Sequence, residues 1–421
     1  MSKKVKNSKY RLPIVILLLI LIITSGKYIS GRFGTSHIED DGQKNISSSK
    51  FLNFHRPRHI LESQMSDGDS HFILPNKTAT IVATGDIMFH TTQIISAFNK
   101  ENGRYDFRSV FEKVKPYISS ADLAIANFES VVAGPQYRYT GYPTFNSPIE
   151  TLQALKATGL DVLSTANNHS LDKGKHGLIN TIDKINELGM DSIGTYKEPS
   201  ERVRIKEING IKIGLLAYTY GCNGLESLLT TSELGTMVNI IDENKIKRDI
   251  EKADELGADI TAVVIHWGNE YQLSPSNEQI QLGEKMVQWG ADIILGSHPH
   301  VIQKSEIINH NGSNKFIIYS MGNFISNQRR ETLDLRNDKY TEDGIIVKLQ
   351  IEKDAFSGET TIKDIDYIPT WVNRYEGSDK FVYEVLPTTD YLGNKDSELS
   401  EEVYSKIEES YNQTISKMSQ Q

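Results

Sequence analysis

Residues of the types that bind metal ions recur along the chain, most of them shortly after a short apolar segment. They are Asp86, Asn127, Glu129, Asn168, His169, Asp172, His266, Glu270, His298, His300 and Asn323. Because the carboxyl ends of strands in α/β sheets surround a common crevice, residues far apart in sequence can converge there. Carboxylate, amide and imidazole groups together suit borderline divalent ions. The pattern therefore predicts a centre for one or two divalent metal ions, with Mn, Fe or Zn as the expected metals.

These motifs differ in how specifically they indicate a metal. The His-Pro-His motif at 298–300 is the most specific, because the proline fixes the local backbone and two imidazoles there suit neighbouring coordination. The Asn-Asn-His motif at 167–169 is next, since amides and imidazoles after a buried strand are costly unless they are paired. Asp86 and the Asn-Phe-Glu motif at 127–129 are weaker, because each could instead cap a helix. His266 alone would be read as a hydrogen-bonded core histidine.

Short apolar runs alternate with longer amphipathic stretches, which is the pattern of an α/β fold. The runs expected as buried strands are 78–84, 123–126, 162–165, 211–217, 261–265, 293–295 and 316–319. The stretches with helical character are 107–119, 149–158, 177–188, 243–256 and 277–289. Residues 344–352 and 360–372 alternate apolar and polar residues, so we expect an antiparallel pair. Apolar residues every four positions from Leu399 to Ile415 predict a C-terminal amphipathic helix.

The N-terminus has the character of a membrane-targeting segment. Five Lys and Arg residues within residues 3–11 precede the apolar run Leu12–Ile23. We expect residues 1–26 to be a cytoplasmic tip and a signal-anchor helix, 27–76 a polar stalk, 77–373 the folded domain, and 374–421 a C-terminal extension. The charge bias then keeps the tip in the cytoplasm and the bulk of the chain outside a single-pass cell membrane anchor. A cleaved, secreted form is the alternative.

Charge and cysteine content exclude some classes of protein. The formal net charge is −9, and residues 1–27 hold six Lys or Arg residues and no acid, so the remainder carries −15. Nucleic acid is therefore not an expected partner. The single cysteine, Cys222, cannot form a disulfide within the chain, and the absence of cysteine ligands excludes a zinc-finger site.

Six ordered strings resemble the CapA family of poly-γ-glutamate capsule synthesis proteins, whose domain is related to the calcineurin-like metallophosphoesterases. The strings are Gly85-Asp86-Ile87-Met88, Asn127-Phe128-Glu129, Ala166-Asn167-Asn168-His169, His266-Trp267-Gly268-Asn269-Glu270, Gly296-Ser297-His298-Pro299-His300 and Ser320-Met321-Gly322-Asn323-Phe324. The resemblance implies a layered αββα sandwich of the calcineurin-like metallophosphoesterase type, with the site at strand ends. An amidohydrolase-type barrel is the alternative, although His-x-His usually opens that domain.

The resemblance also implies roles for individual residues. Asp86 and His300 would hold one metal ion, and Glu129 would take the position of the bridging carboxylate. Asn168, His266 and His298 would hold the second ion. The catalytic residues would be His169, which protonates the leaving oxygen, and Asp172. His90, Asn127, Glu270 and Asn323 are additional candidates. A two-metal site of this kind activates water and neutralises charge on a phosphoryl group.

Two positions depart from the metallophosphoesterase pattern. Met88 stands where these proteins usually have a histidine, two residues after the first Asp. The Asn-Phe-Glu motif at 127–129 replaces their Gly-Asp-x-x-Asp. We therefore expect the first metal to be bound weakly or not at all unless His90 substitutes for the missing histidine.

Three functions fit these observations. The first is a membrane-anchored accessory protein of capsule or poly-γ-glutamate synthesis or export, with synthase or export proteins as partners and an anionic polymer as substrate. The second is an extracytoplasmic metal-dependent hydrolase of a phosphoester or wall polymer. The third is a non-catalytic scaffold with a degenerate site. A domain carrying −15 would repel a polyanion unless metal ions or a local basic patch offset that charge.

Overall fold

The structure is a computed structural model that describes residues 75–333, 336–393 and 399–418. Contacts divide the chain into two units, Met1–Ser70 and His71–Gln421, and only the second contains described residues. The expected signal-anchor helix and all but the last two residues of the expected stalk lie outside the described residues. Within those three ranges, no helix is long and apolar enough to cross a membrane.

The first sheet has eight strands in the described part of the chain. Seven run in the order β16-β15-β14-β1-β4-β5-β6, and β13 pairs with the end of β1. The bounds are β1 Lys77–Ile87, β4 Leu123–Phe128, β5 Val162–Ser164, β6 Asp191–Ile193, β13 Asn323–Ile325, β14 Asp343–Lys353, β15 Thr360–Glu376 and β16 Phe381–Pro387. β1, β4, β5 and β6 are parallel, whereas β14, β15 and β16 add antiparallel pairs. The sheet is therefore mixed, and it continues beyond residue 373.

The second sheet has six strands among the described residues, in the order β11-β12-β10-β9-β8-β7. The bounds are β7 Arg204–Ile208, β8 Ile211–Thr219, β9 Ile260–His266, β10 Ile293–Ser297, β11 Ser305–His310 and β12 Ser313–Ile318. The four central strands are parallel, and antiparallel β7 and β11 form the edges. Because the strands form two open sheets, the barrel alternative is wrong.

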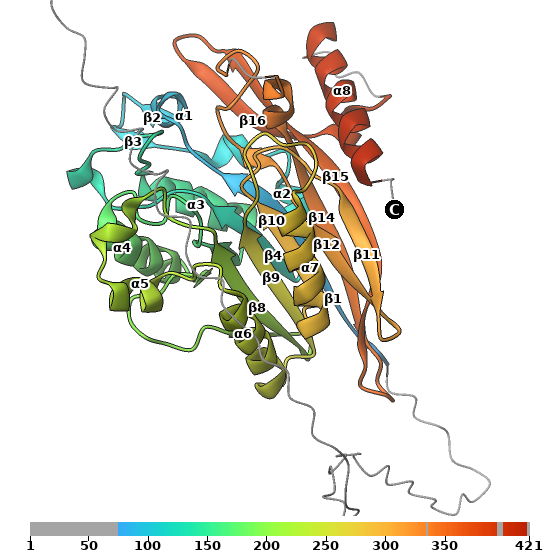
Figure 1. Ribbon diagram of the computed structural model, residues 1–421. Helices are drawn as coiled ribbons and strands as arrows, with labels where there is room; N and C mark the ends of the chain where they lie inside the picture. The colour runs from blue at the N-terminus through green and yellow to red at the C-terminus, as the bar shows by residue number, and fades with distance from the viewer. Residues whose placement is uncertain (1–74, 334–335, 394–398, 419–421) are drawn as a thin grey trace, which may run out of the picture. The chain divides into compact units, whose positions relative to one another are not determined.

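Helices cover the outer faces of the two sheets (Figure 1). Their bounds are α1 Thr91–Ala97, α2 Lys115–Ser119, α3 Ile149–Thr158, α4 Gly174–Glu187, α5 Thr231–Met237, α6 Glu243–Glu255, α7 Asn277–Trp289 and α8 Glu401–Met418, with a small β2 Phe98–Asn99 and β3 Arg104–Tyr105 hairpin. Helices α1, α2 and α3 pack on the first sheet, and α6 and α7 pack on the second. The expected αββα layering is confirmed.

The central strands are apolar throughout because both of their faces are buried. In β9, Ala262 and Val264 point into the core between the sheets, whereas Val263 and Ile265 point into the core beneath α6 and α7. A strand with side chains alternating between two apolar layers reads as a continuous apolar run rather than an alternating one. Each Val or Ile side chain buried in this way contributes about 1.5–3 kcal/mol.

Most of the expected elements are confirmed, but one is wrong. The expected antiparallel pair is β14 and β15, and the expected C-terminal helix is α8. The helix predicted over 107–119 is instead a 3₁₀ turn at Arg108–Phe111 followed by the short α2. Pro116 explains the difference, because proline lacks an N–H group and is tolerated only in the first turn of a helix.

We expect Gly85→Ala to lower the free energy of unfolding by about 2 kcal/mol or more. A Cβ atom at residue 85 would lie 1.9 Å from the carbonyl oxygen of Gly322, where β1 and β13 meet. Gly235→Ala is the matched control: it lies in α5 with no atom within 4 Å, so alanine should raise stability by about 0.5–1 kcal/mol. Urea denaturation measures both, and equal effects would contradict the close packing described at residue 85.

Candidate metal centre

The two sheets bring the polar strand ends together at one end of the sandwich. In the first sheet, Asp86 on β1 is the register partner of Asn127 on β4 and of Asn323 on β13. In the second sheet, His266 at the end of β9 is the register partner of Ser297 at the end of β10. The residues that follow these strands therefore face one another across the gap between the sheets.

Three groups of acidic and histidine side chains in the described residues are compact enough to hold a metal ion. They are Asp86, Glu129 and His300; Glu129, His266 and His298; and Glu270, His298 and His300. Within each group, the candidate ligand atoms all lie within 4.8 Å of one another. Every two groups share one residue, so the three form a single connected centre. Glu270 is the only exposed member.

Asp86 is held by hydrogen bonds from both sheets. Its Oδ1 accepts a hydrogen bond from the Asn127 side-chain amide at 2.7 Å. Its Oδ2 accepts one from the backbone N–H of His298 at 3.2 Å, and His300 Nδ1 lies 3.1 Å from the same oxygen. Since His300 Nδ1 also lies 3.1 Å from Asn323 Oδ1, the ring is fixed in orientation.

Glu129 is fully buried, and neither of its carboxylate oxygens has a hydrogen-bond partner. Oε1 lies 3.6 Å from His266 Nε2 and 3.8 Å from His300 Nε2. Burial, followed by the charges of Asp86 and Glu270, raises the pKa of Glu129 well above its usual value. A buried carboxylate without a partner is costly, so this donor set fits a cation held between the two histidines.

Two histidines of the centre, His266 and His298, favour the uncharged form that binds metals. Burial, followed by the neighbouring His298, lowers the pKa of His266 well below its usual value. Burial, followed by His300, lowers the pKa of His298 to about 3. Nδ1 of His298 is buried without a hydrogen-bond partner, as expected for a nitrogen that accepts a metal ion. The neighbouring Nε2 of His266 lies 2.9 Å from Asn168 Oδ1.

Backbone strain is concentrated in the His-Pro-His loop. His298 has a φ of 96° and His300 a φ of 57°, both in the region that favours glycine. Non-glycine residues in such conformations cost on the order of 1–3 kcal/mol each and persist only where the surroundings enforce them. The hydrogen bonds to Asp86 provide that enforcement for both residues.

His169 and Asp172 form a buried pair beside these groups. His169 Nδ1 lies 2.7 Å from Asp172 Oδ2, and the backbone N–H of Phe145 donates to the same oxygen at 2.5 Å. The contact assigns the Nδ1 proton to the hydrogen bond with Asp172, which leaves Nε2 for proton exchange. His169 is also close enough to contribute to the lowered pKa of His266 and His298.

His90 does not join any of the three groups, although sequence made it a candidate. Its Nδ1 accepts a hydrogen bond from the backbone N–H of Asn327 at 3.3 Å, and its ring packs edge-on against Phe145. Burial, followed by His300, lowers the pKa of His90 to about 4.

Sequence reasoning missed Tyr220 and Ser297, which also contact the centre. The ring of Tyr220 lies 4.6 Å from that of His298 and is 44% exposed, so it lines the mouth of the centre. Ser297 Oγ lies 3.0 Å from His266 Nδ1. Tyr220 directly follows β8, so the strand-end rule would have found it if tyrosine had been counted among the functional residue types.

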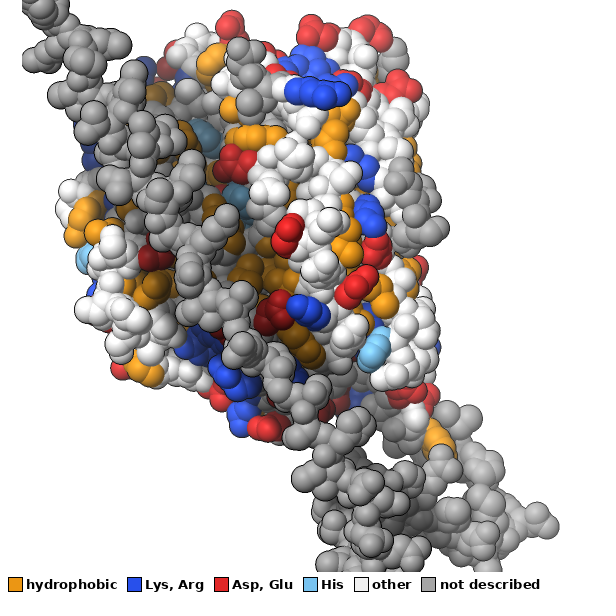
Figure 2. All heavy atoms as spheres, viewed as in Figure 1, with side chains coloured by type: hydrophobic (Ala, Val, Ile, Leu, Met, Phe, Trp, Pro, Cys, Tyr) orange, Lys and Arg blue, Asp and Glu red, His pale blue; other side chains and the backbone are white. Residues whose placement is uncertain are grey.

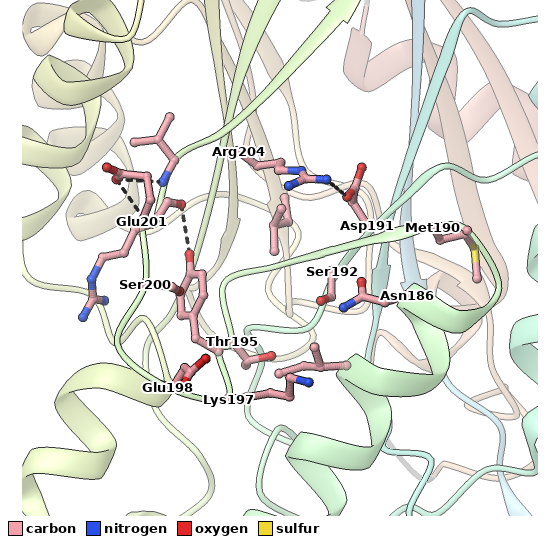
Figure 3. A pocket seen from close by; sticks show the side chains of 16 residues that line it. Asn186, Met190, Asp191, Ser192, Thr195, Lys197, Glu198, Ser200, Glu201 and Arg204 are labelled. Carbon is pink, nitrogen blue, oxygen red and sulfur yellow. Dashed lines mark hydrogen bonds and ion pairs between the residues drawn. The ribbon is translucent and has the colours of Figure 1, made fainter.

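A separate hollow of about 690 Å³ lies against α4, β6 and β7 (Figure 3). None of its lining residues belongs to the three groups. Polar groups that line the hollow pair with one another. Arg204 forms an ion pair with Asp191, and the Tyr196 hydroxyl donates to the backbone oxygen of Arg202 at 2.9 Å. The hollow therefore offers no comparable set of unpartnered ligand atoms.

The comparison with a known protein family and the comparisons with individual proteins agree with each other. The family described as bacterial capsule synthesis protein PGA_cap matches residues 80–328. Capsule biosynthesis protein CapA of Bacillus anthracis is 30% identical over 322 residues, which is 74% of this chain and 71% of that protein. PGA biosynthesis protein CapA of Bacillus subtilis is 28% identical over 273 residues, which is 61% of this chain and 65% of that protein.

Solved structures with a similar fold include the calcineurin-like phosphoesterase YfkN from Bacillus subtilis. The TM-score is 0.40 at 17% identity, covering 81% of this chain and 99% of that one. A phosphatase from Mycoplasma pneumoniae gives a TM-score of 0.42 at 13% identity, covering 76% and 98%. With both TM-scores below 0.5, neither likeness bears on the chemistry of the centre.

We expect Mn²⁺ or Zn²⁺ to raise the melting temperature of the protein, because an ion that binds only the folded state stabilises it by about 2.7 kcal/mol at 100 times its Kd. Glu129→Gln should lose most of this shift and should not lower the stability of the EDTA-treated protein, since it removes an unpaired buried charge. Glu207→Gln, exposed on β7, is the matched control. Thermal unfolding with and without metal measures this, and equal shifts in all three proteins would contradict the ligand assignment.

Proposed function

This chain belongs to the bacterial capsule synthesis protein family PGA_cap, and we propose that it serves the synthesis or export of an anionic capsule polymer, such as poly-γ-glutamate, through a divalent metal centre. In this proposal the domain lies outside the cytoplasmic membrane, held by the signal-anchor segment of residues 1–26 and close to polymer synthase or export proteins. The names of the two Bacillus relatives support a role in the synthesis of a capsule polymer. The basic and apolar pattern of the N-terminal sequence supports the membrane anchor and the location outside the cytoplasm.

The observation that carries the metal part of the proposal is the environment of Glu129. It is shared by two groups of potential ligands, one with Asp86 and His300 and the other with His266 and His298. Its two oxygens are buried and unpartnered. Glu129 could therefore serve both groups of ligands, and Asn168 would complete the second one.

The chain's own residues then provide binding, and they provide proton transfer only where a bond is broken. Divalent ions, when bound, would supply neutralisation of negative charge on a carboxylate or phosphoryl group. His169 would transfer a proton at Nε2 while Asp172 holds its Nδ1, since a carboxylate partner stabilises the imidazolium. The exposed ring edge of Tyr220 would contact the part of the polymer that enters the mouth.

The charge balance of the domain makes this binding dependent on the metal. On the face shown in Figure 2, Lys and Arg side chains are interspersed with Asp and Glu, and no extended basic surface appears. A domain of net negative charge repels a polyanion at long range. Divalent ions at the mouth of the centre would provide a local attraction for the polymer.

Hydrolysis of a phosphoester or wall polymer is the second candidate function. The specific observation that favours it is the buried His169 and Asp172 pair, which contributes no ligand to the three groups yet lies beside them. Such a pair is expected where a leaving group needs a proton and is unnecessary for metal binding alone.

We expect His300→Ala to abolish capsule formation in the bacterium that makes this protein, without loss of the protein from the membrane fraction, because His300 belongs to two of the three groups. Capsule is measured by immunoblotting of surface polymer, with Glu207→Gln as the control. His169→Ala separates the two candidates, since it leaves the ligands in place. Loss of capsule in His169→Ala supports hydrolysis, and retention supports binding alone. Normal capsule in His300→Ala would contradict use of the centre.

A further inference from the structure

The centre lacks a ligand at the position where metallophosphoesterases usually carry a histidine. Met88 occupies that position and is 1% exposed, and its backbone N–H donates to Ile325 O at 2.9 Å. His90, the replacement expected from sequence, has its Nδ1 engaged by Asn327 and belongs to none of the groups. The set around Asp86 and His300 is therefore incomplete unless another side chain supplies a donor.

Glu270 is an exposed acidic residue that shares a group with His300 of this incomplete set. Its carboxylate and the ring nitrogens of His298 and His300 lie within 4.8 Å of one another. Because Glu270 is exposed whereas both histidines are buried, it forms the solvent-facing wall of the centre. His298 Nδ1 is buried, unpartnered and available to this group.

The loop after β9 fixes Glu270 in this place. The backbone N–H of Tyr271 donates to the oxygen of Pro299 at 2.8 Å, which ties Glu270 to the His-Pro-His loop. Asn337 donates to the oxygen of Tyr271 at 2.8 Å. Tyr271 has a φ of 62°, a strained conformation that these two hydrogen bonds hold in place. The Tyr271 hydroxyl accepts a hydrogen bond from the Gln328 side-chain amide at 3.2 Å, and the charge of Glu270 acts on this hydroxyl.

The acidic side chains around this position favour the binding of a cation. Asp86 and Glu129 are buried, and the charge of Glu270 acts on Glu129. In the ion pairs of the described residues, neither buried carboxylate has a Lys or Arg partner; each is paired only with histidine. Asp86, Glu129 and Glu270 thus bring three carboxyl groups to one centre with no Lys or Arg partner on the two buried ones, which favours a bound cation.

We propose that Glu270 is a direct ligand of the metal ion bound by Asp86 and His300, and that it closes the solvent side of the centre in place of the histidine missing at Met88. The inference rests on the proposed function only in requiring that the centre binds metal. Glu270 lies on the surface, so its substitution leaves the buried donor set and the fold intact.

Isothermal titration of the full chain with Mn²⁺ tests this assignment. Glu270→Gln should weaken Mn²⁺ binding at one of two sites by about 10-fold or more, the range seen when supporting groups of metal sites are removed. Glu270→Asp, which keeps the charge but shortens the side chain, should also weaken binding. Glu207→Gln should bind as the wild type does. The melting temperature of each EDTA-treated variant should equal that of the wild type.

The outcomes separate this inference from the proposed function. Wild-type binding at two sites with unchanged affinity in Glu270→Gln would overturn the role of Glu270 and leave the metal centre standing. Unchanged affinity in Glu270→Asp alone would show that the charge acts at a distance, and would overturn direct ligation. A wild type that binds no Mn²⁺ would overturn both the centre and the inference.

Discussion

A buried carboxylate without a hydrogen-bond partner is the constraint on which the rest of the centre depends. Glu129 is taken out of water directly after β4, and the nearest positively chargeable groups are histidine nitrogens at 3.6 and 3.8 Å. The effective cost of burying an uncompensated charge is several kcal/mol, and lowered pKa values keep the nearby His266 and His298 from supplying a positive charge. A divalent ion resolves this conflict, because carboxylate and neutral imidazole are both its ligands.

The sandwich makes such a centre possible because it brings two parallel-strand edges together. The first sheet contributes Asp86 and Glu129, whereas the second contributes His266 and the His-Pro-His loop. Two of the three groups draw their side chains from both sheets. The apolar core between the sheets, with its strands buried on both faces, keeps the two edges in register. The strained φ values at His298 and His300 persist only because the surrounding structure holds the loop rigidly.

Much of the fold could be predicted because its signals are local. Strands buried on both faces read as apolar runs, and the terminal helix shows its period in residues 399–415. Pro116 shows the limit of local reasoning, because the amphipathic pattern of 107–119 favours a longer helix than this helix-breaking residue allows. The anchor and nearly all of the stalk lie outside the described residues, so those expectations stay predictions.

Candidate residues at the centre could be proposed from the strand-end rule, but their mutual distances could not. The rule treats His90 and Glu270 alike, and only three-dimensional placement separates a histidine engaged by Asn327 from a glutamate beside His298. Tyr220 and Ser297 could not be predicted as part of the centre, because hydroxyl groups are too common at strand ends to stand out in sequence. The most direct test of the account is electron paramagnetic resonance of the Mn²⁺-loaded protein. A shared Glu129 predicts the spectrum of two spin-coupled ions, whereas the six-line spectrum of an isolated ion would contradict it.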